Sequence, residues 1–189
     1  MERQKVITRR AALAALVGAA SLVTSVAHAQ STPSAQSIER SLSAPTKGLA
    51  PAKRVSPRIF KQRPELRRIA PSINIQSINF AFGSDRIPQD QYWKVERIAV
   101  AMNRILQRNP REVFLIEGHT DAVGSNTSNL ALSERRARSL ARQLTRFGVS
   151  PRAMETIGYG EEDLLVQTQR EDWRNRRVAL RRITDFITR

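Results

Sequence analysis

The segment from Glu117 to Ala137, EGHTDAVGSNTSNLALSERRA, brings both charge signs and many hydrogen-bonding groups into one short stretch. It follows a short apolar run and leads into an amphipathic helix, so its polar groups gather where a strand is expected to end. Asp121 can accept hydrogen bonds from an ammonium group, and Arg136 can bind a carboxylate through its planar guanidinium. This composition favours a small zwitterionic ligand over an apolar one.

The expected start of the helix gives Arg136 a further role. With Ser133 as the N-cap, Arg136 would stand in the first turn, beside unpaired backbone N–H groups and the positive end of the helix dipole. A ligand carboxylate could bind there while an ammonium on the same carbon reaches Asp121. Asn129 and Thr120 could supply neutral hydrogen bonds. Two structural alternatives stay open on the residues alone: Asp121 and Arg136 pair with each other, or Asp121 caps a turn as an Asx motif.

Catalytic and metal chemistry find little support in the same segment. His119 stands two residues before Asp121, but the other histidine, His28, lies in the N-terminal leader, and the chain contains no cysteine. No second carboxylate cluster completes a metal site, so we interpret His119 as a structural residue at a strand end. Ser133 has no histidine partner and no G-x-S-x-G motif around it. We therefore predict a protein without catalytic residues, metal or cofactor.

The apolar periodicity predicts the elements that hold this segment. In chain order they are a strand over 73–82 with a break near 76–77, a helix over 88–107, a strand over 113–116, a helix over 133–148, a strand over 154–157 and a last strand over 176–183. The continuous apolar run Val113–Ile116 is typical of a central strand covered on both faces. The order β-α-β-α-β-β predicts an α+β fold, a two-layer sandwich with a mixed sheet and both helices on one face.

The N-terminus has the features of a leader. A basic start, an apolar run and the small-x-small sequence before Gln30 predict a secretory signal peptide over residues 1–29. Arg9–Arg10 leaves both twin-arginine and general secretory export open, and a retained transmembrane anchor is the alternative to cleavage. Because no cysteine is present, we expect no lipid anchor on the mature protein.

Residues 30–71 form a basic stretch rich in proline, serine and alanine. They carry nine basic and two acidic residues, a net charge of +7 within the +15 of the whole chain. The repeated prolines and sparse aromatics predict an extended, flexible segment, with a short helix or docking segment over 58–69 as a secondary expectation. Its charge suits an anionic polymer or lipid, or an envelope protein, and export argues against nucleic acid. A solvated linker that binds nothing is the structural alternative.

Several motifs then occur together in order. They are EGHTD, Gly124, Asn129, LSERRA, GYGE and NRRV, spread over residues 76–184. This set resembles the C-terminal domain of the outer-membrane protein A (OmpA) type, which binds peptidoglycan in Gram-negative bacteria. The resemblance assigns residues 72–189 to such a domain and implies the fold expected above.

The resemblance also implies a ligand, the diaminopimelate residue of peptidoglycan stem peptides. On the matching positions, Asp121 would bind the ligand's ammonium and Arg136 its carboxylate, with Asn129 and Thr120 as further contacts. The arginines of NRRV would support the fold. One departure is the absence of proline after GYGE, where this chain reads EEDLLVQT.

Together these features predict an exported, non-enzymatic peptidoglycan-binding protein of the periplasm, with outer-membrane association as a further option. The alternative is a soluble envelope adaptor whose basic residues 30–71 bind an anionic or protein partner, with wall binding secondary.

Overall fold

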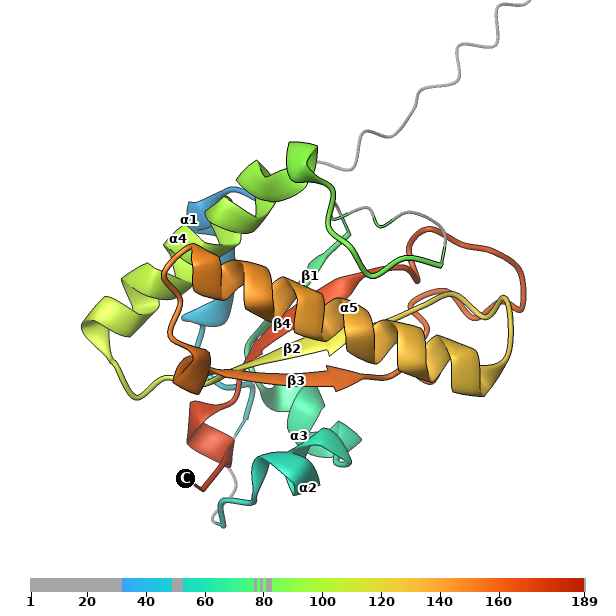
Figure 1. Ribbon diagram of the computed structural model, residues 1–189. Coiled ribbons are helices and arrows are strands. Elements are labelled where there is room, and N and C mark those ends of the chain that lie inside the picture. The colour runs from blue at the N-terminus through green and yellow to red at the C-terminus, as the bar shows by residue number, and fades with distance from the viewer. Residues whose placement is uncertain (1–31, 49–52, 77, 79, 81–82, 189) are drawn as a thin grey trace, which may run out of the picture.

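Four short strands form one mixed sheet in the computed structural model, which describes residues 32–48, 53–76, 78, 80 and 83–188 (Figure 1). The strands are β1 (Ser72–Ile75), β2 (Phe114–Gly118), β3 (Met154–Gly158) and β4 (Val178–Arg182), in the spatial order β1-β4-β2-β3. β2 runs parallel to β3, and β4 is antiparallel to both of its neighbours. The predicted α+β class and mixed sheet are confirmed.

The two long helices, α4 (Tyr92–Arg108) and α5 (Asn126–Arg146), cover one face of this sheet, as the order of elements predicts (Figure 1). The predicted apolar stripe of α4 is buried, with Val95, Ile98 and Met102 fully inaccessible. On β2, Phe114 belongs to the core beneath these helices, whereas Leu115 belongs to a second core on the opposite face. The central strand is thus covered on both sides, which its continuous apolar run predicts.

The start of α5 differs from the prediction. The helix begins at Asn126, and its N-cap is Ser125, whose hydroxyl accepts a hydrogen bond from Ser128 N at 3.2 Å. Ser133 is therefore not a cap: it is fully buried inside the helix and accepts a hydrogen bond from Gly160 N at 2.8 Å. The start of the helix escapes the periodicity argument because the side chains that it buries, Asn129 and Ser133, are polar, while Leu130 is 39% exposed.

The first strand is also shorter than expected. Pairing between β1 and β4 ends at Ile75, which agrees with the predicted break at Gln76. Ile78 and Phe80 lie outside the strand but pack on the core, and positions 77, 79, 81 and 82 fall outside the described residues.

The N-terminal segment contradicts the flexible extension predicted for residues 30–71, in the parts that the structure describes. α1 (Ala35–Leu42) packs against α4 through Ile38 and Leu42, both fully buried. α2 (Pro57–Lys61) and α3 (Pro64–Ile69) lie on the opposite face of the sheet, where Phe60 packs against Phe186 at 5.5 Å between ring centroids (Figure 1).

The proline argument misled because Pro57 and Pro64 occupy first helical positions, where proline is favoured. The secondary expectation of short helices over 58–69 is confirmed. The predicted signal peptide lies outside the described residues.

The described residues also form short 3-10 helices, η1 (Gln89–Gln91), η2 (Pro151–Ala153) and η3 (Thr184–Phe186). Within the described part of the chain, no helix combines the length and apolar character needed to cross a membrane.

Candidate ligand-binding site

Two glycines bring α5 directly onto the ends of β2 and β3. A Cβ atom on Gly118 would collide with the carbonyl group of Ser133, and one on Gly158 would collide with the backbone of Glu134. Because neither glycine has a side chain, the helix can rest on the strand ends. The loops that follow these strands, residues 119–125 and 159–177, therefore meet at one end of α5.

Asp121 lies at this meeting point and is 8% exposed. Its Oδ2 atom accepts a hydrogen bond from Arg176 Nη1 at 2.7 Å, and its Oδ1 atom accepts one from Val123 N at 3.4 Å. The second bond is the Asx-type turn considered as a structural alternative. The pairing of Asp121 with Arg136 is not formed, since the carboxylate contacts Arg176 instead.

Arg136 is 7% exposed and stands inside α5 rather than in its first turn, because the helix begins ten residues earlier. The prediction that free backbone N–H groups of the helix start would help to bind an anion beside Arg136 is therefore wrong. Its Nε atom donates to Ser84 O at 3.1 Å, and its Cζ atom lies 4.9 Å from the centroid of the Phe80 ring. No carboxylate of the described residues lies within ion-pair distance of this guanidinium.

The electrostatic surroundings of Arg136 reflect this lack of a partner. Burial lowers the pKa of Arg136, and the positive charge of Arg176 lowers it further, against the opposing effect of Asp121 and Asp85. A guanidinium keeps its charge under such conditions. The site therefore holds a nearly buried positive charge without direct compensation among the described residues.

A cavity of about 200 Å³ opens beside Arg136. Its walls combine three guanidinium groups with aromatic and apolar surface, and the lining residues are Ile78, Phe80, His119, Arg136, Trp173, Arg176 and Arg177. A cavity of this size and composition suits a small ligand that carries an anionic group and an aliphatic portion.

The two predicted neutral contacts lie close to Asp121. Asn129 donates to Asp121 O at 3.3 Å, to Val123 O at 3.2 Å and to Glu161 Oε2 at 2.6 Å. It thus holds the loop in place with its amide group. Thr120 is 2% exposed, and its hydroxyl has no hydrogen-bond partner among the described residues.

His119 lines the cavity and is nearly buried. It is 1% exposed, and neither ring nitrogen has a partner among the described residues. Burial, helped by the charges of Arg177, Arg67 and Arg181, holds its pKa well below the usual value. No group of metal-ligating side chains occurs in the described part of the chain.

Sequence reasoning assigned Arg176 to support of the fold, yet the structure brings it to the site, where it contacts Asp121. Arg176 and Asp121 are 55 residues apart in the sequence. Periodicity arguments cover only neighbouring residues, so they could not predict this contact. Arg177 does support the fold: its side chain binds Asn74 Oδ1 at 3.2 Å and Asp163 O at 3.0 Å, and it lines the cavity as well.

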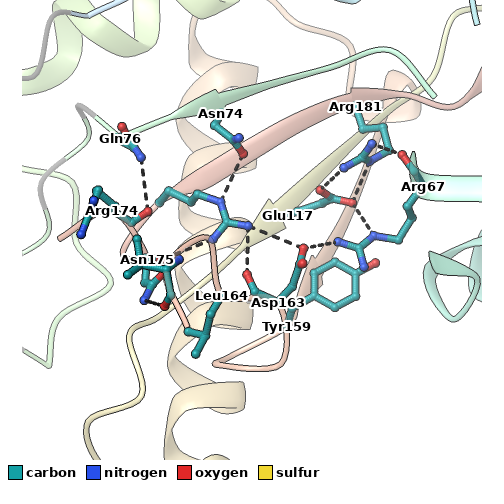
Figure 2. A network of polar contacts seen from close by, with 12 residues as sticks. Arg67, Asn74, Gln76, Glu117, Tyr159, Asp163, Leu164, Arg174, Asn175 and Arg181 are labelled. Atoms are coloured by element: carbon teal, nitrogen blue, oxygen red, sulfur yellow. Dashed lines mark hydrogen bonds and ion pairs between the residues drawn. The ribbon is translucent and has the colours of Figure 1, made fainter. Parts of the chain in front are cut away.

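A buried charge network adjoins the site on the opposite face of the sheet (Figure 2). Its centre is Glu117, which is inaccessible to solvent and binds both Arg67 and Arg181. A fully buried carboxylate is tolerated when several charged hydrogen bonds compensate it. Arg67 comes from α3, so the N-terminal segment takes part in the polar core of the domain.

The fold and the site together define a small α+β domain with a charged, ligand-sized cavity at the ends of its central strands. A profile described as OmpA family matches residues 79–177, just over half of the chain. The chain therefore belongs to the OmpA family.

Curated relatives carry envelope names. The chain is 43% identical over 79 residues to the "Peptidoglycan-associated lipoprotein" of Pseudomonas putida, which covers 41% of this chain and 47% of the relative. It is 30% identical over 114 residues to "Outer membrane porin F" of Pseudomonas aeruginosa, and this aligned region covers 58% of this chain and 31% of the relative. The chain thus spans less than half the length of these two relatives.

The chain is also similar to solved structures of envelope proteins. A peptidoglycan-associated lipoprotein from Burkholderia pseudomallei shares 28% identity at a TM-score of 0.46, over 59% of this chain and 87% of that one. The periplasmic domain of Helicobacter pylori MotB shares 24% identity at a TM-score of 0.49, over 59% and 73%.

Proposed function

We propose that this protein is an exported, non-enzymatic peptidoglycan-binding protein of the Gram-negative periplasm, which recognises diaminopimelate in the stem peptides. Membership of the OmpA family and relatives named for association with peptidoglycan support the proposal. The mature protein would act at the cell wall, with association to the outer membrane as an extension of the same role.

The observation that carries the proposal is the nearly buried guanidinium of Arg136 in the cavity wall, which has no carboxylate within ion-pair distance among the described residues. A buried guanidinium without a carboxylate partner lowers the stability of the fold. A ligand carboxylate that enters the cavity and binds Arg136 would offset that cost. Diaminopimelate ends in an amino acid head group whose carboxylate has the planar geometry that a guanidinium binds.

The ammonium of the same head group would bind Asp121. In the structure Arg176 holds that carboxylate, but its side chain is 37% exposed and also contacts Glu171 at 2.7 Å. Arg176 can therefore remain with Glu171 when an ammonium takes its place. The hydroxyl of the neighbouring Thr120 has no hydrogen-bond partner in the described part of the chain, and Asn129 would hold the loop in the shape that the ligand requires.

The decisive experiment is pull-down of the purified protein on sacculi of two kinds. Diaminopimelate-type stem peptides carry the terminal carboxylate that lysine-type stem peptides lack, so the two materials differ in the group assigned to Arg136. We expect binding to the first and little binding to the second. Arg136→Gln should abolish binding, whereas Arg138→Gln, on the exposed side of the same helix, should preserve it. Equal retention on both sacculi would contradict the assignment of Arg136.

A second candidate function is that of an envelope adaptor that binds an anionic or protein partner through the N-terminal basic residues. The observation in its favour is an exposed set of cations on and beside α2 and α3, namely Lys53, Arg54, Arg58, Arg63 and Arg68. Because Phe60 and Arg67 of this segment are buried, deletion would damage the fold. Replacing the five exposed cations by glutamine is the suitable test: co-purification of an envelope partner should be lost while binding to sacculi persists.

A further inference from the structure

Arg67 connects the N-terminal segment to the wall of the cavity. It lies on α3, outside the residues 79–177 that match the OmpA family, and is 8% exposed. We propose that Arg67 is a positioning residue through which residues 53–71 set the shape of the candidate site and, resting on the proposed function, its affinity for the stem peptide.

The first connection runs through the loop between β3 and β4 (Figure 2). Arg67 Nη2 donates to Asp163 Oδ2 at 2.8 Å. Asp163 also contacts Arg177: the Nη2 atom of Arg177 donates to the Asp163 backbone carbonyl at 3.0 Å and lies 3.5 Å from Asp163 Oδ2. Since Arg177 lines the cavity, the carboxylate of Asp163 joins an N-terminal arginine to the cavity wall.

The second connection runs through an aromatic ring. The Cζ atom of Arg67 lies 3.8 Å from the centroid of the Tyr159 ring, and that ring stacks against His119 with 5.5 Å between centroids. His119 is a second residue of the cavity wall. Because its ring nitrogens have no hydrogen-bond partner among the described residues, the imidazole is held by packing, to which the Tyr159 ring contributes.

Arg67 can position these groups because its own guanidinium is held at the buried end. Its Nε atom donates to Glu117 Oε1 at 3.1 Å, and Arg181 donates to both Glu117 oxygens at 3.0 and 3.1 Å. Arg181 also donates to the backbone carbonyl of Arg67 (Figure 2). It donates to the carbonyl of Ala70 as well, and the two bonds fix the end of α3. A planar guanidinium can bridge two carboxylates and stack on a ring at the same time, which a lysine ammonium cannot do.

The same geometry makes the proposal testable without loss of the fold. In an Arg67→Lys variant, Arg181 still compensates Glu117 with two hydrogen bonds, so no buried carboxylate is left alone. Asp163 has a side chain that is 47% exposed, so Asp163→Asn removes the carboxylate charge from the connection at low risk to the fold. Arg63→Lys is the matched control, because Arg63 lies on the same segment but pairs only with the exposed Glu65 among the described residues.

The first readout needs no ligand. The chain has two tryptophans, and Trp173 lines the cavity while Trp93 lies on α4, so Trp93→Phe leaves Trp173 as the reporter of the loop. In that background, Arg67→Lys and Asp163→Asn should both red-shift Trp173 emission and increase its quenching by acrylamide. Arg63→Lys should leave both signals unchanged. Unaltered Trp173 signals in Arg67→Lys and Asp163→Asn would overturn the proposal.

The second readout is the affinity for a soluble diaminopimelate-containing muropeptide. We expect Arg67→Lys and Asp163→Asn each to weaken binding by about tenfold, the size of coupling carried by side-chain networks. The double variant should be no weaker than Arg67→Lys alone, because Asp163→Asn acts on one of the connections that Arg67→Lys already alters. Multiplying effects would overturn the connection through Asp163. If the parent protein binds no muropeptide, the proposed function fails, and the Trp173 signals alone decide whether Arg67 positions the loop.

Discussion

One nitrogen atom of Arg176 serves two carboxylates: Nη1 lies 2.7 Å from Asp121 Oδ2 and 2.7 Å from Glu171 Oε1. Asp121 is nearly buried, whereas the side chain of Glu171 is 72% exposed. The arginine therefore occupies the position proposed for a ligand ammonium and retains a solvent-exposed partner to which it can withdraw.

Asp121→Asn should remove the preference of the protein for a free amino group. The wild type should bind a diaminopimelate muropeptide at least about tenfold more tightly than the same muropeptide with its side-chain amine acetylated, because a hydrogen bond between charged groups is lost. The variant should bind both ligands equally weakly. Isothermal titration with the two ligands measures this, and a preference that persists in Asp121→Asn would contradict the ammonium assignment.

Glu171→Gln should weaken ligand binding although Glu171 contacts no ligand in the proposed arrangement. Without its second carboxylate, Arg176 would be held by Asp121 alone, and the ligand ammonium would have to displace it. We expect a loss of severalfold in affinity, on the scale of an exposed ion pair. Glu162→Gln, on the same loop, is the control. Tighter binding by Glu171→Gln would show that Arg176 does not compete with the ligand.

His119 should make stability depend on pH in a defined direction. Its pKa in the folded protein lies well below 6.5, so below pH 6.5 the unfolded chain takes up a proton that the folded protein does not. The free energy of unfolding should therefore fall as pH drops below 6.5, by roughly 1 kcal/mol per pH unit from this residue.

A His119→Gln variant lacks this contribution, so the difference in unfolding free energy between wild type and variant should shrink from pH 7.5 to pH 5.5. Urea unfolding at both values measures it. An NMR titration in which the His119 imidazole of the folded protein protonates near pH 6.5 would refute the expectation.

Gly118→Ala should destabilise the domain by about 1–3 kcal/mol, the usual cost of overpacking. The added methyl group would meet the backbone of Ser133, which cannot rotate away as a side chain could. Thermal unfolding of this variant beside Thr156→Ala, on the neighbouring strand, would separate the collision from a general effect of altering the sheet. A melting temperature equal to that of the wild type would mean that α5 does not rest on β2.

The sequence predicted the elements whose apolar residues recur with a regular period. α4, β2 and β3 lie close to their expected places because Val95, Ile98 and Met102 mark one helical face and Phe114 and Leu115 an apolar run. The start of α5 was missed because the side chains that it buries, Asn129 and Ser133, are polar. Apolar periodicity gives no signal where the buried positions of a helix are polar.

The sequence predicted part of the arrangement at the candidate site, namely which residues lie near one another. Asp121, Asn129 and Thr120 are close in sequence, and the structure does bring them together. Arg176 and the packing of Arg67 on Glu117 depend on contacts across 55 and 50 residues, which only the fold decides. The folded structure of the N-terminal segment was not predicted because a few buried apolar residues, such as Ile38 and Phe60, are enough to dock its short helices.

The path of the N-terminal segment has a mechanical consequence. α1 packs with the layer of α4 and α5, whereas α2 and α3 lie across the sheet from them (Figure 1). Tension applied at residue 32 would first peel α1 from α4 one turn at a time. It would then load α2 and α3, which precede β1 in the chain and are held to the sheet by the buried side chains of Phe60 and Arg67. The domain would therefore yield under a pulling force in two steps of unequal strength, the weaker of which leaves Arg67 and the cavity in place.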